Sequence, residues 1–133
     1  MDPAMQELVD AARRMQGEFP LAKDDYTAAS AAAALRTASG AIRTGVCVEV
    51  ACGIGFCAEH AAIAEMLKHR ETRIAAIVAV GNGAIVPPCG RCRELMMQVD
   101  HRNLEAKVIV GEDRIVTLRE LLPQPWLATK IGT

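Results

Sequence analysis

Three cysteines and one glutamate stand at a spacing that could bind a metal ion and use it. Cys57 and Glu59 lie two residues apart, and Cys89 and Cys92 lie three residues apart directly after Pro88. A zinc ion that takes part in chemistry has three protein ligands and one open position for water. The three cysteines would supply those ligands, and Glu59 would supply a carboxylate that can act first as a base and then as an acid.

The same spacing restricts where these residues can lie on helices. If Pro88 opens a helix, Cys89 and Cys92 share one face of its first turn. Cys57 and Glu59 would point apart inside a helix, so they can share a site only where a helix begins. The glycine-rich approach to Cys57 permits such a sharp entry. We therefore expect both cysteine motifs at helix N-termini.

The charge of such a site needs an electrostatic offset. Three thiolates around Zn²⁺ leave a net negative charge, which opposes the ionisation of a water molecule on the metal. Two helix N-termini would favour the thiolates through their partial positive charge. Arg91, Arg93 and His60 are close in sequence to the ligands, and we expect their side chains to hydrogen-bond the cysteine sulfurs.

Other interpretations of the cysteines explain less of the pattern. A Cys-x-x-Cys pair alone could be a redox pair. A structural zinc site would need a fourth ligand, and neither Cys47 nor Cys52 has a suitable spacing. Cys47 lies in a predicted strand, where a small buried residue is the simpler interpretation. Cys-x-Glu followed by Pro-Cys-x-x-Cys is the joint signature of zinc deaminases, and it favours a catalytic metal.

Composition limits the class of protein. The chain has 133 residues, which predicts one domain over residues 1–133, and 51% of them are hydrophobic but only 3% aromatic. Fifteen basic and sixteen acidic residues give a net charge of -1, so a nucleic-acid partner is not expected. There is no membrane-length apolar run and no signal-peptide pattern after Met1. We expect a reduced cytoplasmic compartment in which the cysteines need not form disulfides.

The elements that would position the motifs follow from periodicity and turn residues. Asp2 should cap a first helix that ends before Gly17. The alanine-rich segment has helical propensity, but the turn at 37–40 and the β-rich limb after it favour a strand over 29–36. The remaining expected elements are strands at 42–51, 74–80, 107–110 and 114–117 and helices at 57–69, 89–99 and 118–122. This order predicts an α/β fold with helices on both faces of a sheet of about five strands, and the metal site at one edge.

At these residues the chain resembles the cytidine deaminase superfamily, in the short, tetrameric-type branch that includes blasticidin S deaminases. The resemblance covers nearly the whole chain, and the zinc motifs are its most specific part. The similar segments are the first strand at 26–35, the T-G-x-N-x-E segment at 44–49, the zinc motifs at 57–59 and 88–93, and the C-terminal motif at 120–123.

The resemblance implies a three-layer α/β/α sandwich with a mixed sheet, and a homotetramer whose active sites are completed by neighbouring subunits. It implies that Zn²⁺ is the cofactor, held by the three cysteines. Glu59 would take a proton from water, protonate the ring nitrogen and pass a proton to the leaving ammonia. Ala58 would help to orient the ring. Trp126 falls near the family's C-terminal aromatic residue, which can reach an active site, although an interface or core tryptophan is the alternative.

Departures from the family pattern concern the substrate. Cytidine deaminases hold ribose with the Asn and Glu of the T-G-x-N-x-E segment, with a Phe of the first strand nearby. Here Cys47 replaces the Asn, Glu49 keeps the acid and Ala29 stands at the Phe position. Cysteine is a poor substitute for an amide, so a hydroxyl partner is lost. Ala29 and Ser30 resemble the blasticidin branch, but Glu49 does not match the tyrosine expected there.

Three hypotheses therefore remain open. The first is a zinc-dependent hydrolytic deaminase that replaces the exocyclic amino group of a cytidine- or cytosine-like heterocycle by oxygen. The second is a deaminase of a free base, a base analogue or an aminopyrimidine antibiotic such as blasticidin S. The third is a non-catalytic, zinc-stabilised oligomer or redox protein, which would have no need of Glu59.

Two further departures from the family pattern lie beside the zinc motifs. His60 replaces the arginine that often follows Cys-Ala-Glu in the family, and Glu94 stands where a glutamine is usual.

Overall fold

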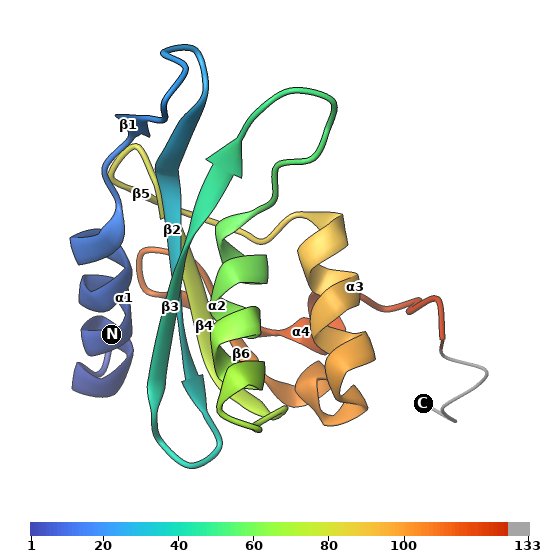
Figure 1. The fold of residues 1–133 in the computed structure, drawn as a ribbon. Coiled ribbons are helices and arrows are strands. Elements are labelled where there is room, and N and C mark those ends of the chain that lie inside the picture. Colours follow the sequence, from blue (N-terminus) through green and yellow to red (C-terminus); the bar gives the residue numbers. More distant parts are fainter. Residues whose placement is uncertain (128–133) are drawn as a thin grey trace.

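A mixed β-sheet separates two layers of helices in the computed structural model, which describes residues 1–127 (Figure 1). The expected three-layer α/β/α architecture is confirmed. The helices are α1 (Pro3–Met15), α2 (Ala58–Lys68), α3 (Gly90–Val99), the 3-10 helix η1 (His101–Glu105) and α4 (Leu118–Leu121). The strands are β1 (Phe19–Pro20), β2 (Thr27–Thr37), β3 (Ile42–Glu49), β4 (Ile74–Gly81), β5 (Ala84–Val86), β6 (Lys107–Gly111) and β7 (Arg114–Thr117). Among residues 1–127, no helix has the length and apolar character that crossing a membrane would require.

The sheet has seven strands over the described residues, and the expectation of about five was too low. The five longer strands lie in the order β3-β2-β4-β6-β7, with β4 and β6 parallel and the other neighbours antiparallel. The two additional strands are short: β1 pairs with the start of β2, and β5 pairs with the end of β4. Two or three residues are too few to carry a recognisable alternation, which explains why the sequence did not predict them.

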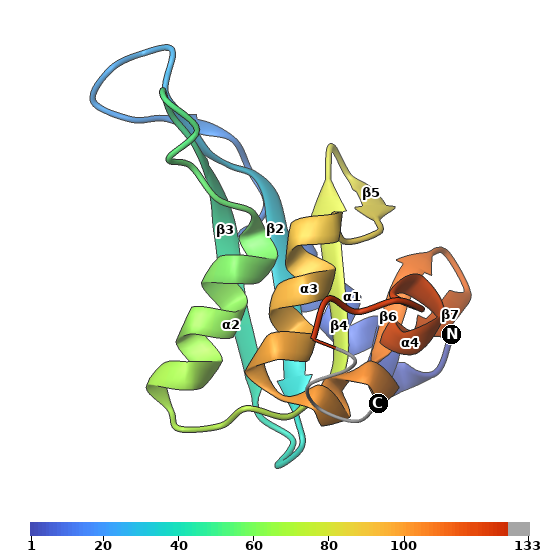
Figure 2. The same ribbon diagram turned by 90° about the vertical axis from the view of Figure 1, so that its right-hand side faces the viewer.

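Alternation along β2 builds the two cores on either side of the sheet. Ala33 and Leu35 face the core formed with α2 and α3, whereas Ala32 and Ala34 face the core formed with α1. Figure 1 shows α1 alone on one face, and Figure 2 shows α2 beside α3 on the other. The buried side chains of α2 are Ala58, Glu59, Ala62, Ile63 and Met66, whereas Leu67 is 38% exposed.

The register between β2 and β3 contains a bulge that bears on the site. Ala28 pairs with Val48, and the next pair is Ala32 with Val46, so the three residues 29–31 face the single residue between those two. Ala29, within the bulge, has a φ of 65°, a left-handed conformation that costs an alanine about 1–2 kcal/mol. Tertiary contacts must therefore hold this backbone in place.

Both cysteine motifs stand at helix starts, as expected. Cys57 is the N-cap of α2, with an extended backbone, and Glu59 is in the first turn. Cys89 is the N-cap of α3, which begins at Gly90. Pro88 therefore precedes the helix and does not open it, and the helix expected over 89–99 begins one residue later, at Gly90.

Candidate metal centre and active site

The three cysteines of the two motifs come together at the starts of α2 and α3. The Sγ atoms of Cys57, Cys89 and Cys92 all lie within 4.8 Å of one another. Cys57 and Cys89 are 3.5 Å apart, and Cys89 and Cys92 are 3.4 Å apart. Two sulfurs bound at about 2.3 Å to a tetrahedral zinc are about 3.8 Å apart. The donor set and its spacing therefore fit Zn²⁺ with one position left open.

The three thiols differ in their tendency to ionise. Burial raises the pKa of Cys57 and, more strongly, that of Cys92. Burial also acts to raise the pKa of Cys89, but the backbone amides of Cys92 and Arg91 and the neighbouring thiols outweigh it, and the net pKa is lowered. The N-terminus of α3 thus favours a thiolate at its own N-cap.

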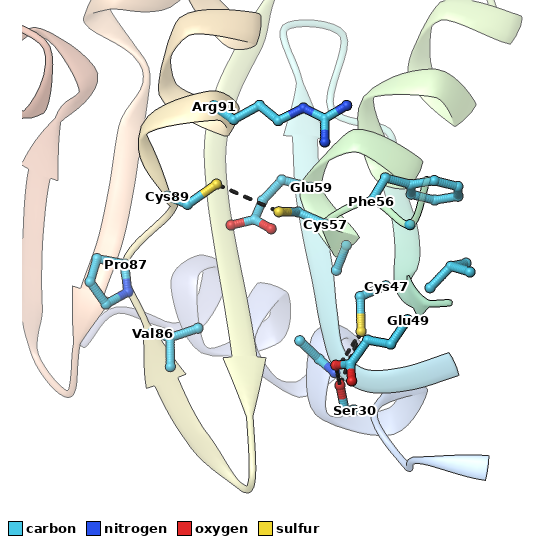
Figure 3. Close-up of a pocket in the computed structure, with 14 residues that line it drawn as sticks. Ser30, Cys47, Glu49, Phe56, Cys57, Glu59, Val86, Pro87, Cys89 and Arg91 are labelled. Atoms are coloured by element: carbon cyan, nitrogen blue, oxygen red, sulfur yellow. Dashed lines mark hydrogen bonds between the residues drawn. The ribbon is translucent and has the colours of Figure 1, made fainter. Parts of the chain in front are cut away.

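Glu59 is a buried carboxyl group beside the sulfurs. It is only 6% exposed, and it lines the same pocket as Cys57 and Cys89 (Figure 3). Burial raises the pKa of Glu59, and a hydrogen bond with Cys92 acts in the opposite direction. A carboxyl group whose pKa is raised toward neutrality can both accept and return a proton.

His60 contacts one of the sulfurs. Its Nδ1 lies 3.4 Å from Sγ of Cys92. Burial and the charge of Arg91 lower the pKa of His60, which favours a neutral imidazole. A neutral imidazole can still donate one N–H to a thiolate. The expectation of a sulfur contact is thus met at this residue, without the positive charge that an arginine would bring.

In the part of the chain that the structure describes, neither Arg91 nor Arg93 shows the expected side-chain hydrogen bond to a cysteine sulfur. Arg93 donates from Nε to the carbonyl of Pro88 at 2.8 Å and from a terminal nitrogen to the carbonyl of Leu121 at 3.1 Å. Among the described residues, it therefore holds the backbone before Cys89 and makes no hydrogen bond to a sulfur. Arg91 lines the pocket, and its charge acts on His60. Arg91 therefore acts on the site through the charge of its side chain and through its backbone amide, which lowers the pKa of Cys89.

Cys57, Cys89 and Glu59 form one end of a pocket of about 440 Å³, a volume within the usual range of about 300–1,000 Å³ for small-ligand sites. Figure 3 shows Cys57, Cys89 and Glu59 gathered at this end. Ala58, for which the sequence predicted a place at the substrate, also lines the pocket. The pocket therefore extends outward from Cys57, Cys89 and Glu59.

The other end of the pocket is polar and includes a residue that the sequence analysis did not assign to the site. Ser30 donates from Oγ to Oε1 of Glu49 at 2.6 Å, and its Oγ lies 3.2 Å from Sγ of Cys47. Glu49 and Cys47 were predicted to face the substrate, and both line the pocket. Ser30 reaches them because of the bulge in β2, and no sequence pattern specifies that bulge.

Phe56 and Val86 also line the pocket, and neither was predicted. Phe56 pairs with Val48 through two backbone hydrogen bonds of 3.0 and 3.1 Å, which fix the segment that leads into Cys57. Gly55 permits this approach, because an added Cβ would collide with the carbonyl of Val48. In the sequence, only the Gly53-Ile54-Gly55 segment before Phe56 could have indicated this close approach.

Trp126 lies away from this pocket. It is 74% exposed and does not line the site that the sulfurs form. Its backbone N–H donates to Oε1 of Glu94 at 2.7 Å, and Oε2 of Glu94 accepts from Gln98. The acid at position 94 thus anchors the segment that carries the tryptophan to α3.

Comparison with known proteins finds relatives of one kind. No family model matches the chain. Two curated relatives, the cytidine deaminases of Mycobacterium tuberculosis strains CDC 1551 and H37Rv, are each 33% identical over 75 residues. This segment is 55% of the chain and 56% of each relative, so the chain matches about half the length of these relatives.

Solved structures extend the similarity to nearly the whole chain. The cytidine deaminase of Mycobacterium leprae is 30% identical with a TM-score of 0.76, covering 92% of this chain and 100% of that one. The cytidine deaminase of M. tuberculosis has a TM-score of 0.78 at 27% identity, covering 94% and 98%. That of Burkholderia pseudomallei has a TM-score of 0.73 at 27% identity, covering 95% and 100%. With the three sulfurs, the buried glutamate and the α/β/α fold, these matches show that the chain belongs to the cytidine deaminase superfamily.

Proposed function

We propose that the protein is a zinc-dependent hydrolase that replaces the exocyclic amino group of a cytidine-like heterocycle by oxygen. The observation that carries the proposal is the buried carboxyl of Glu59 in one pocket with Cys57 and Cys89, whose sulfurs cluster with that of Cys92. A purely structural metal site has no use for such a carboxyl group. Membership of the cytidine deaminase superfamily supports the same reaction.

The three cysteines would hold Zn²⁺, which is the cofactor of this proposal. When bound, the ion supplies Lewis-acid chemistry that lowers the pKa of a water molecule and so makes a nucleophile available near neutral pH. The amides at the start of α3 favour the thiolate of Cys89. His60 is placed to donate a hydrogen bond to Cys92, which would orient this ligand.

Glu59 would carry the protons of the reaction. As a base it accepts a proton from the attacking water, while a C–O bond forms at the carbon that bears the amino group. As an acid it then delivers that proton to the ring nitrogen. The second proton of the water, released from the new C–OH group as its C=O bond forms, passes through Glu59 to the amino group, and the C–N bond breaks to release ammonia. The raised pKa of Glu59, caused by its burial, suits a group that must perform both steps.

For the substrate, cytidine-type compounds come first, because the structurally similar proteins are cytidine deaminases. A free base, a base analogue or an aminopyrimidine antibiotic such as blasticidin S is the second candidate. The cysteine at position 47 favours the second candidate, because it offers a substrate hydroxyl a weaker partner than an amide would. The compartment that suits the free thiols is the reducing cytoplasm.

We also propose that the chain forms a homotetramer with shared active sites. Ile54 is 74% exposed and Phe56 is 40% exposed. Both belong to the loop that borders the pocket, so a second copy covering this loop would also cover the pocket mouth. The exposed Trp126 is placed to serve a neighbouring copy, since it does not line the pocket of its own chain.

The test is ammonia release by the zinc-loaded protein. The panel contains cytidine, deoxycytidine, cytosine, blasticidin S and aminated base analogues, with Glu59→Ala as the variant. We expect turnover of at least one pyrimidine by the parent protein. Glu59→Ala should keep zinc, measured by metal analysis, and lose turnover by at least about 100-fold. Retention of full deamination by this variant would contradict the proposed mechanism.

A further inference from the structure

The bulge in β2 turns Ser30 toward the polar end of the pocket, and contacts outside the site hold it there. The N–H of Gly17 donates to the carbonyl of Ala29 at 2.9 Å. The side chain of Gln16 donates to the carbonyl of Ser30 at 3.1 Å. The segment that follows α1 therefore supports the left-handed residue and the serine after it. Such support indicates that the position of the hydroxyl is maintained at a cost in backbone strain.

The Ser30 hydroxyl is the middle member of a one-directional chain of hydrogen bonds. The N–H of Ala31 donates to Sγ of Cys47 at 3.3 Å, and this sulfur lies 3.2 Å from Oγ of Ser30. Ser30 has one hydroxyl proton and donates it to Oε1 of Glu49 at 2.6 Å, so the Cys47 thiol must donate to Ser30. Hydrogen bonds in a chain strengthen one another, and this chain ends on the carboxylate of Glu49.

One oxygen of Glu49 remains available to a ligand. Oε1 accepts from Ser30, whereas no hydrogen bond within residues 1–127 reaches Oε2. A carboxylate only accepts hydrogen bonds, so it can bind only a ligand group that donates. Cys57, Cys89 and Glu59 occupy the opposite end of the same pocket (Figure 3). A ring held at the sulfur end would thus extend a substituent toward Glu49.

We infer that Ser30 is a positioning residue that fixes Glu49 as the acceptor for a hydrogen-bond-donating substituent on the substrate ring. The pocket then selects substituted heterocycles over free bases. The inference rests on the proposed deaminase function. A role of Glu49 toward a sugar hydroxyl is already implied by the resemblance to cytidine deaminases, and the inference adds Ser30 as the residue that positions it. The donor is either a sugar hydroxyl or an ammonium group, and the experiment separates these two sources.

The experiment measures kcat and KM of the zinc-loaded protein for cytidine, blasticidin S and cytosine. The variants are Ser30→Ala, Ser30→Thr and a matched control, Ser39→Ala. Ser39 also donates to a glutamate, Glu71, at 2.7 Å, but near the distant turn between β2 and β3. Ser30→Ala should raise KM for a substituted substrate about tenfold and change kcat much less. For cytosine the loss should be several-fold smaller, Ser30→Thr should restore KM, and Ser39→Ala should match the parent protein.

The substrate that responds identifies the donor. If KM for cytidine depends on Ser30, the donor is a hydroxyl. If only KM for blasticidin S depends on Ser30, the donor is an ammonium group. A double-mutant cycle with Glu49→Gln then tests the route of the effect. Because Ser30 acts through Glu49, Ser30→Ala should cost little more once Glu49 is changed.

Three results would overturn the inference: an equal loss for cytosine and the substituted substrates, a loss that Ser30→Thr does not restore, or full additivity with Glu49→Gln. Binding of the same compounds to zinc-loaded Glu59→Gln protein, measured by calorimetry, provides a readout that needs no turnover. If the parent protein deaminates nothing in the panel, the proposed function fails. The binding data still decide whether Ser30 distinguishes substituted rings from bare ones.

Discussion

At the scale of single residues, His60 contacts Cys92 through a hydrogen bond. The arginine that the resemblance would place here would instead bring a positive charge. The ring nitrogen of His60 lies 3.4 Å from Cys92, and burial lowers its pKa. The residue therefore contributes a directed hydrogen bond more than a positive charge. A partner of this kind holds a metal ligand in its binding orientation.

His60→Ala should consequently weaken zinc binding by about 10–100-fold. The measurement is competition with a chromophoric chelator, using protein reduced and stripped of metal. His69→Ala is the matched control, because this histidine caps the far end of α2 and contacts Glu65. An unchanged zinc affinity for His60→Ala would show that the contact with Cys92 has no role in holding the metal.

A second residue-scale prediction concerns acid stability at Asp100. Hydrogen bonds from the Arg102 side chain, and from Thr72, hold the pKa of Asp100 well below its ordinary value of 3.8. A carboxyl group with a depressed folded-state pKa stabilises the fold above the unfolded-state pKa, and this contribution is lost as pH falls through the folded-state pKa.

Asp100→Asn should therefore lower the free energy of unfolding by about 1 kcal/mol at pH 7, a modest value because Arg102 is solvated. The difference from the parent protein should shrink below about pH 4. Urea unfolding at pH 7, 5 and 3 measures it, with Asp24→Asn in the exposed loop as control. A difference that stays constant over this range would contradict the linkage.

At the scale of elements, Gly45 allows α2 to lie directly on β3. An added Cβ would collide with Ala61 and with the backbone of Ala62. Gly45→Ala should therefore destabilise the protein by about 1–3 kcal/mol through overpacking. Thermal unfolding measures the loss. Gly17→Ala, where an added Cβ meets no atom within 4 Å, should have an unfolding temperature within a few degrees of the parent value.

The elements that the sequence predicted are those with a strong local signal. The Asp2 cap and its proline specified α1, and turn residues specified the hairpin of β2 and β3. β1 and β5 were missed because their pairing depends on neighbouring strands and not on their own residues. η1, which lies between the expected helix at 89–99 and the expected strand at 107–110, was missed for a similar reason. It depends on the Asp100 side chain, which accepts from the N–H of Arg102.

The residues of the candidate site likewise fall into those that could be predicted from the sequence and those that could not. That the cysteines and Glu59 lie together could be predicted, because the motif combines particular residue types at particular spacings. Ser30 could not be assigned, because its place depends on a bulge whose register is decided by the pairing of two strands. Arg93 was assigned a sulfur contact from proximity in sequence, whereas its side chain spans to the carbonyl of Leu121, 28 residues away.

At the scale of the whole molecule, the loop before α2 offers a test of assembly. If copies associate through this loop, Ile54→Glu should convert a tetramer into smaller species and lower turnover at the same time. Light scattering coupled to gel filtration measures the mass. Met15→Glu on α1, where the parent residue is 47% exposed, is the control that should leave the mass unchanged. A monomeric parent protein would remove the basis for shared active sites.

The alanine-rich β2 has a consequence for how the chain folds during synthesis. Alanine is the strongest helix former, so this segment in isolation prefers the wrong secondary structure. Its strand form depends on β3, which follows closely, and on β4, whose Gly81 pairs with Ala31. A nascent chain cannot complete the centre of the sheet until β4 has left the ribosome. Until then, only its pairing with β3 opposes the helical propensity of the segment that carries Ser30.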